Sequence, residues 1–223
     1  MKWLTRNGLI AALVVGGAVV AGTGWRGVVV LFAFFISGSA LTQFSGGAEG
    51  ARTARQVLAN GGVAAAAAAL GWWPVMAGAL AAAAADTWAT EIGSFSPSLP
   101  RLIMTFAPVP PGTSGGITPL GTAGGVAGAA ALAGVALLVR PPGTPAAFTG
   151  LALAGVAGMA VDSALGSTVQ AKYGCMTCGA RSERAGAQCH GPMRLLGGRA
   201  WIDNDVVNAA ATLVGAGIGA AVA

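Results

Sequence analysis

Long apolar stretches, separated by short polar segments, run through most of the chain. Seven can be delimited, at residues 8–20, 27–41, 57–70, 73–92, 120–139, 146–169 and 206–222. A helix that crosses a membrane needs about twenty mainly apolar residues. The pattern therefore predicts an all-α fold: a polytopic integral membrane helix bundle of about seven transmembrane helices, in a single domain over residues 1–223. The Ala-rich third stretch either crosses the bilayer or dips into it.

The composition favours the same interpretation. Hydrophobic residues make up 55% of the 223 residues and charged residues only 9%, and the mean hydropathy is +0.72. A soluble domain usually carries about 25% charged residues, so this chain has too few charges to cover a surface that faces water. This excludes an ordinary soluble enzyme, a disordered chain and a disulfide-rich secreted module.

The distribution of basic residues predicts the orientation. With seven crossings and the N-terminus inside, only Arg26 and Arg140 of the 12 Lys and Arg residues fall outside the cytoplasmic segments. This bias follows the positive-inside rule. The basic residues form no run that would bind nucleic acid. We therefore expect a multi-pass cell membrane protein with a cytoplasmic N-terminus and active site. The first stretch is similar to a signal peptide, but a retained helix is the simpler interpretation.

Three carboxylates lie inside apolar stretches: Asp86, Glu91 and Asp162. An ionisable group within a membrane span is costly and is a functional candidate by default. Ser163 and Gln170 accompany Asp162, so two helices each present a carboxylate with polar neighbours. Mg²⁺ prefers oxygen ligands and is usually held by one or two carboxylates with substrate phosphates. A proton or ion relay in a transporter is the alternative interpretation.

The segment between the fourth and fifth stretches is rich in glycine and hydroxyl residues. Backbone N–H groups of such a segment can converge on an anion, and the start of the next helix adds a positive dipole. The segment therefore either cradles a phosphate or is a flexible turn, and it lacks the Lys of a Walker A loop. The candidate residues are Gly112, Thr113, Ser114, Gly115, Gly116 and Thr118.

A second polar segment precedes the third stretch. Gln56, which follows Arg55, and Asn60 lie at helical spacing, and arginine is a frequent partner of phosphate oxygens. We expect Arg55 to be functional and Arg52 to belong to a charged loop edge.

The start of the seventh stretch is also polar. Asp203 or Asn204 can cap the helix, whereas Asp205 and Asn208 lie on one side of it, one turn apart. We interpret Asn204, Asp205 and Asn208 as residues that face the ligand.

The last connection, residues 172–200, holds all three cysteines. Cys175 and Cys178 form a CxxC pair, and Cys189 is followed by His190, the sole histidine of the chain. Four such ligands are typical of a structural zinc site, and unligated thiols are the alternative. A reducing cytoplasm argues against stable disulfides.

Together these motifs resemble the integral membrane family that contains the chloroplast phytyl-phosphate kinase and transmembrane protein 19. The matching stretches follow the order of the family over about two thirds of the chain: residues 55–61 (RQVLANG), 86–93 (DTWATEIG), 111–118 (PGTSGGIT), 162–170 (DSALGSTVQ), the Cys-rich segment and 201–208 (WIDNDVVN).

The resemblance implies phosphoryl transfer from a nucleoside triphosphate, CTP in the plant relatives, to an isoprenyl monophosphate, giving the diphosphate. Mg²⁺ would be held by Asp162 and by Asp86 or Glu91, and the glycine-rich segment would cradle the triphosphate. Arg55 would balance charge. Such a reaction depends on positioning and charge neutralisation more than on covalent catalysis, so the residues fit the implied chemistry.

Two alternatives stay open. A lipid alcohol kinase or a cytidylyltransferase would use the same kinds of residues. A lipid or ion transporter would also place carboxylates in the membrane, although its site is expected near the midplane between repeats, and the sequence shows no repeat.

Overall fold

The computed structural model describes residues 3–46, 50–140, 144–187 and 189–222. Within them the chain forms six helices and five short strands. The helices are α1 (Arg6–Phe44), α2 (Ala54–Ala69), α3 (Trp73–Gly93), α4 (Pro119–Val139), α5 (Pro145–Thr168) and α6 (Asn204–Ala221). The strands are β1 (Arg101–Leu102), β2 (Gly116–Ile117), β3 (Lys172–Cys175), β4 (Arg181–Ser182) and β5 (Met193–Gly197). The chain was predicted to be all-α, and its mostly helical character is confirmed.

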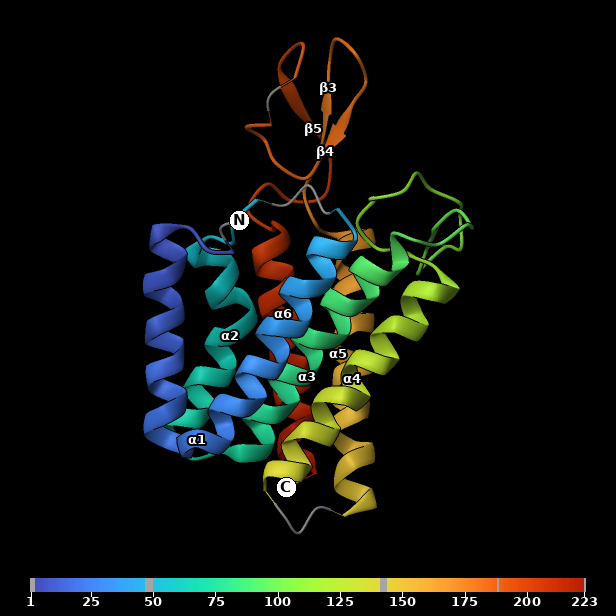
Figure 1. Ribbon diagram of the computed structural model, residues 1–223. Coiled ribbons are helices and arrows are strands. Elements are labelled where there is room, and N and C mark those ends of the chain that lie inside the picture. The colour runs from blue at the N-terminus through green and yellow to red at the C-terminus, as the bar shows by residue number, and fades with distance from the viewer. Residues whose placement is uncertain (1–2, 47–49, 141–143, 188, 223) are drawn as a thin grey trace.

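Helix α1 contains the first two apolar stretches because it folds back on itself at Gly24. This residue has φ 64° and ψ −158°, a conformation that glycine adopts readily and other residues do not. The two halves of α1 run in opposite directions (Figure 1). The other five apolar stretches fall largely in α2 to α6. Among the described helices, α1, α4 and α5 are long and apolar enough to cross a membrane.

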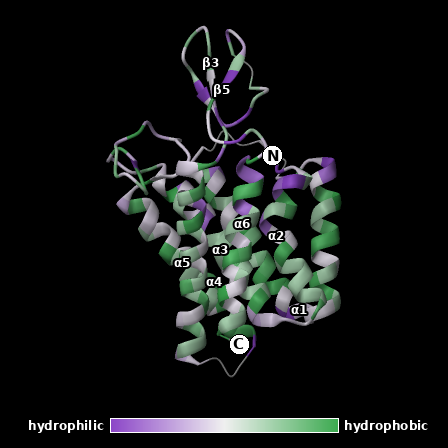
Figure 2. Cartoon of the chain, turned by 180° about the vertical axis from the view of Figure 1, so that it is seen from behind, coloured by the Kyte–Doolittle hydropathy of each residue, from purple (hydrophilic) through white to green (hydrophobic). Residues whose placement is uncertain are grey.

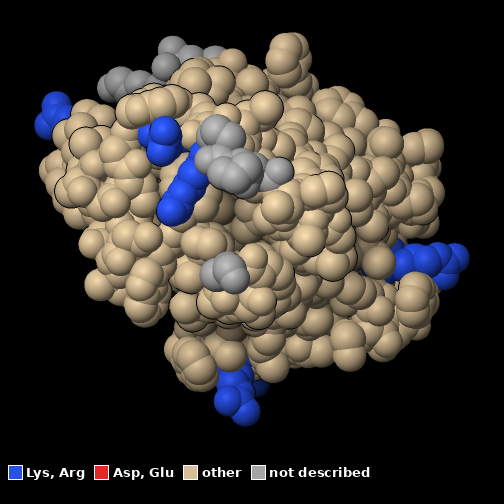
Figure 3. Space-filling model, turned by 90° about the horizontal axis from the view of Figure 1, so that it is seen from below, with Lys and Arg blue, Asp and Glu red and all other residues tan. Residues whose placement is uncertain are grey.

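The two ends of the bundle differ in character. The N-terminus, the connection that contains β1 and β2, and the sheet of β3, β4 and β5 lie at one end, and the C-terminus lies at the other (Figure 1). We call the first the polar end, formed by residues 3–5, 50–53, 94–118, 169–187 and 189–203. The helices between the two ends are mainly hydrophobic (Figure 2). Seen from the opposite end, the described surface shows scattered Lys and Arg and no Asp or Glu (Figure 3).

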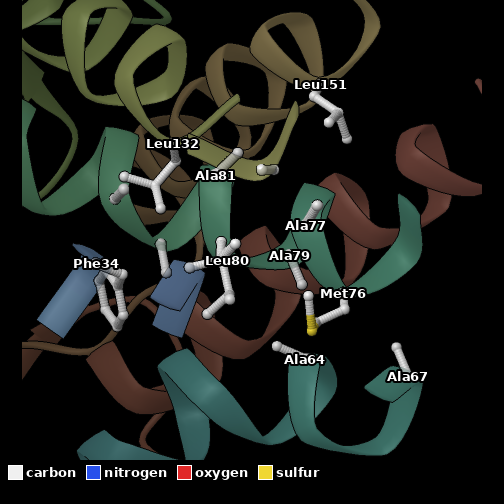
Figure 4. Close-up of a cluster of buried hydrophobic side chains, with 14 of the residues drawn as sticks. Phe34, Ala64, Ala67, Met76, Ala77, Ala79, Leu80, Ala81, Leu132 and Leu151 are labelled. Carbon is white, nitrogen blue, oxygen red and sulfur yellow. The ribbon is translucent and has the colours of Figure 1, made fainter. Parts of the chain in front are cut away.

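Helix α3 is the centre of the bundle and packs against α1, α2, α4, α5 and α6. Its residues 76–85 are buried, and Leu80 lies within the cluster of core side chains drawn in Figure 4. Many of these side chains are alanine, and Gly78 of α3 directly faces Gly215 of α6. Small residues let helix backbones approach closely in a membrane. Because of this close packing, the last turns of α3 are surrounded by the neighbouring helices.

The Cys-rich segment was expected to be a loop, but it forms an antiparallel sheet in the order β4-β3-β5. A further antiparallel pair, β1 and β2, closes the connection between α3 and α4. The prediction of an all-α fold misses these strands. They are two to five residues long, which is too short for an alternating hydrophobic pattern to reveal them.

Candidate functional site

Carboxylates from two helices meet near the polar end. Asp86 on α3 and Asp162 on α5 lie close enough for the charge of Asp86 to act on Asp162. The Oδ2 atom of Asp162 is buried and has no hydrogen-bond partner among the described residues. A buried polar atom without a partner is costly unless a ligand or ion satisfies it. The pair offers oxygen ligands of the kind that Mg²⁺ prefers.

Small residues one turn earlier bring these two helices together. A Cβ atom added at Gly158 of α5 would collide with Ala82 of α3. Both residues lie four positions before their carboxylate, so the contact and the carboxylate pair lie on the same faces of the helices. The missing side chain at Gly158 and the small one at Ala82 therefore let α3 and α5 approach closely enough to bring Asp86 near Asp162.

Glu91, the third predicted carboxylate, faces the end of α1. The Thr42 hydroxyl donates a hydrogen bond to Glu91 Oε1 at 2.6 Å, and the Ser45 hydroxyl donates to Oε2. Glu91 lies on α3 with Asp86 but is bound to α1 by these two hydroxyl groups. The structure thus gives Glu91 and Asp162 different surroundings.

The glycine-rich segment packs directly onto the end of α5. Gly115 has φ 77°, and a Cβ atom there would overlap the backbone at Ser163 and Ser167. Gly166 faces the backbone of the same segment, at Ser114 and Gly115. These contacts bring the segment within about one helical turn of Asp162.

Several hydrogen-bonding groups of this segment already have partners within the protein. The Gly116 N–H donates to the Thr113 carbonyl oxygen at 3.0 Å, and the Thr113 hydroxyl donates to the Pro110 carbonyl oxygen at 2.7 Å. Thr118 caps α4, and its hydroxyl oxygen accepts from the Gly121 N–H at 3.0 Å. The predicted phosphate cradle from Gly112 to Thr118 therefore has fewer donors to offer than the sequence suggests.

Two charged residues beside this segment were not singled out from the sequence. Glu183 accepts a hydrogen bond from the Ser114 hydroxyl, and its charge acts on Asp162. Lys172 donates from Nζ to the Ser167 carbonyl oxygen at 2.9 Å. Burial lowers the pKa of Lys172, and the charge of Glu183 opposes this shift. A Lys just after a helix C-terminus is a detectable signal, whereas nothing in the spacing points to Glu183.

Gln170 supplies a second buried polar atom without a partner. The residue is 1% exposed, and its Nε2 atom has no hydrogen-bond partner in the described part of the chain. It follows Asp162 by eight residues, close to Gly166. Two such atoms at the end of one helix indicate that a polar ligand belongs here.

Arg55 is bound to α6. Its Nη2 donates to Asp203 Oδ2 at 2.7 Å, and its Nε lies 3.4 Å from Asp205 Oδ2. Asp203 also caps α6, because its Oδ1 accepts from the Val206 N–H at 3.1 Å. The Arg55 side chain is 68% exposed, so this residue joins two helices at the surface of the polar end.

A cavity of about 850 Å³ opens beside the carboxylates. Its polar wall contains Asp86 and Glu91 of α3, together with Asn60, Asn204 and Asn208. The cavity therefore gathers predicted residues from three helices.

Arg52, which was interpreted as part of a loop edge, also lines this cavity. Its Nη1 donates to Ser39 Oγ at 3.2 Å, and its guanidinium lies 5.6 Å from the centre of the Phe35 ring. Asp86 lines the cavity, and its charge also acts on Asp162. Asp86 therefore lies between the cavity and Asp162.

The three cysteines also come together. Their Sγ atoms all lie within 4.8 Å of one another, and those of Cys178 and Cys189 are 3.2 Å apart. Hydrogen bonds from the backbone at Cys178 and Thr177 lower the pKa of Cys175 to about 6, which favours the thiolate that binds metals. His190, predicted as the fourth ligand, is not part of this group.

Comparison of the sequence with known proteins identifies the family to which the chain belongs. The model of the family described as "Integral membrane protein DUF92" matches residues 1–216. The chain belongs to this family. The family resemblance that the ordered motifs predicted is thereby confirmed. Among curated proteins, Protein PGR of Arabidopsis thaliana is 35% identical over 96 residues, which is 38% of this chain and 33% of the relative. The chain thus aligns with about a third of that relative's length. No solved structure matches the chain.

Proposed function

We propose that this protein transfers the γ-phosphoryl group of a nucleoside triphosphate, CTP by preference, to an isoprenyl monophosphate. The observation that supports the proposal most directly is the position of Asp86 and Asp162. These two carboxylates lie between a polar, glycine-rich region and a cavity. On one side lie the glycine-rich segment, Lys172 and Glu183. On the other lies a cavity that is polar near the carboxylates and apolar beyond them.

The residues at the junction fit a Mg²⁺ ion. Asp162 Oδ2 is buried without a partner and Asp86 adjoins it, so these two carboxylates would hold the ion. The ion would neutralise charge on the phosphates.

The side with the glycine-rich segment suits the triphosphate. The N–H groups of Gly116 and Gly121 are bonded within the protein. The positive dipole at the start of α4 and the ammonium group of Lys172 still favour an anion on this side. Glu183 fixes this segment through Ser114, so its role is positional.

The cavity suits the acceptor. A phosphate oxygen of the isoprenyl monophosphate would attack the γ-phosphorus, the bond from that phosphorus to the bridging oxygen would break, and the nucleoside diphosphate would leave. Because a phosphate oxygen is already ionised at neutral pH, the reaction needs no strong general base. Arg52, Asn60 and Asn208 would orient the acceptor phosphate.

The difference between the two ends of the bundle supports the predicted orientation. We place the polar end in the cytoplasm, with seven crossings formed by the two halves of α1 and by α2 to α6. Arg26 follows the Gly24 turn of α1, and Arg140 follows the last residue of α4. This turn and this helix end both lie at the opposite end of the bundle (Figure 1). Of the ten basic residues predicted to be cytoplasmic, Lys2 lies outside the described residues.

The Cys-rich sheet is proposed as a structural zinc site. Three short strands bury too little apolar surface to be stable alone, and small units of this kind often depend on a metal. Cys175, Cys178 and Cys189 would hold the ion. Because Glu183 lies between the second and third of these cysteines, the zinc would also keep Glu183 against Ser114.

The test is product analysis with purified protein, Mg²⁺, CTP labelled in its γ-phosphate, and phytyl or geranylgeranyl monophosphate. The proposal predicts a labelled isoprenyl diphosphate and CDP. Release of pyrophosphate with CMP attached to the lipid would identify a cytidylyltransferase. Phosphorylation of the alcohol alone would identify a lipid alcohol kinase, and substrate movement in liposomes without nucleotide would identify a transporter. Each of these three results contradicts the proposal.

A further inference from the structure

The cavity beside the carboxylates extends between the two halves of α1. Away from the carboxylates its wall is apolar and is supplied by both halves, which meet at the Gly24 turn. The apolar wall includes Leu9, Leu13 and Val20 from the first half and Val28, Phe32 and Phe35 from the second half. A volume of about 850 Å³ lies within the range of small-molecule sites, about 300–1,000 Å³.

The change from polar to apolar wall occurs at Arg52. Its guanidinium lies over the Phe35 ring and also contacts Ser39. A ligand whose anionic head is bound by Arg52 would therefore extend its apolar part toward the Gly24 turn. This is the arrangement of charge and apolar surface in an isoprenyl phosphate.

The apolar part of the cavity also opens sideways. Leu13 is 68% exposed and Val20 is 54% exposed, although both line the cavity. In a membrane these side chains border the lipid, so an isoprenyl tail can enter from the bilayer without leaving an apolar environment.

Two glycines in the middle of the first half of α1 keep this space open. Gly16 and Gly17 both line the cavity, and a Cβ atom added at either would find no atom within 4 Å. The packing of the described helices therefore does not require glycine at these positions. Glycine is also a poor helix former, so its presence needs another reason.

We propose that the space between the two halves of α1 binds the isoprenyl tail and that Gly16 and Gly17 set the longest tail it accepts. The identity of the tail rests on the proposed function. A larger side chain at either position would project into the tail space and shorten it, while leaving the head group site at Arg52 unchanged.

The test measures the binding of geranyl and geranylgeranyl monophosphate, without nucleotide, to the full chain in detergent. The variants are Gly17→Leu and, as an independent second, Gly16→Leu. The control is Gly217→Leu in α6, where an added Cβ atom also meets nothing within 4 Å but the residue lies outside this cavity. We expect both variants to bind the longer geranylgeranyl ligand about tenfold more weakly or worse, and the shorter ligand within about twofold of wild type.

Three results would overturn the assignment. These are an equal loss for both tail lengths, no loss in either variant, or the same selective loss in Gly217→Leu. Because the assay contains no nucleotide, it separates this inference from the proposed function. Selective binding without any phosphoryl transfer would leave the tail site standing and refute the kinase. Phosphoryl transfer by the wild-type protein, with no change in tail-length preference in the Gly16 and Gly17 variants, would support the kinase and refute the tail site.

Discussion

The contact between the glycine-rich segment and α5 can be tested with a single methyl group. In Gly115→Ala the new Cβ atom would overlap the backbone at Ser163 and Ser167. Backbone atoms of a helix cannot give way as a flexible side chain can, so the segment must move away from α5. The displacement occurs within about one helical turn of Asp162.

The expected cost has two parts. A φ of 77° at Gly115 places an L-residue in the left-handed region, at about 1–2 kcal/mol. Overpacking against α5 adds about 1–3 kcal/mol. The sum is about 2–5 kcal/mol of lost stability.

Gly112→Ala is the matched control. Gly112 has the same φ of 77°, but an added Cβ atom there finds nothing within 4 Å. This variant should therefore lose only the conformational part, about 1–2 kcal/mol. The difference between the two variants isolates the contact with α5.

Two assays check this prediction. Thermal unfolding in detergent, followed by tryptophan fluorescence, should show Gly115→Ala melting about 2 °C or more below Gly112→Ala, since about 1 kcal/mol shifts the midpoint by about 2–4 °C at this chain length. Transfer rates measured well below both midpoints should be about 10²-fold lower in Gly115→Ala than in wild type, as expected for a misplaced binding segment. Equal midpoints and equal rates in the two variants would refute the packing of Gly115 on α5.

The remaining predictions concern charge and metal. Asp162→Asn removes a charge at nearly constant volume, so transfer should be lost while insertion and melting persist; normal turnover would show that Asp162 holds no metal. Arg52→Gln should lower the transfer rate about tenfold or more, whereas Arg55→Gln should change stability by less than about 1 kcal/mol, as for an exposed ion pair, and leave most of the rate; the opposite ranking would show that Arg55 contacts the phosphates. Cys178→Ser should release zinc, measured by elemental analysis of protein purified under reducing conditions, and wild-type protein free of zinc would contradict the metal site.

The helices and the common location of the polar residues could be predicted from the sequence. The apolar stretches have nearly the length of membrane spans, and alternate connections of such a bundle lie at the same end. Asp86 and Asp162 could therefore be expected on the same side, and small residues such as Gly158 could be expected to bring their helices close.

Contacts between distant segments could not be predicted in this way. Arg52 and Arg55 are separated by the cap at Thr53, so one precedes α2 and the other lies in its first turn. Because the two residues differ in position relative to the start of α2, Arg55 pairs with Asp203, whereas Arg52 lines the cavity. Glu183 meets Ser114 across 69 residues of sequence, a distance over which spacing carries no information.

The central claim, that carboxylates of α3 and α5 form one metal and phosphate site, is tested most directly by Mn²⁺ binding. Electron paramagnetic resonance would count the ions bound to the full chain with a non-hydrolysable CTP analogue. We predict one ion in the wild-type protein and its loss in Asp86→Asn and in Asp162→Asn alike. Retention of the ion in both single variants would contradict the account.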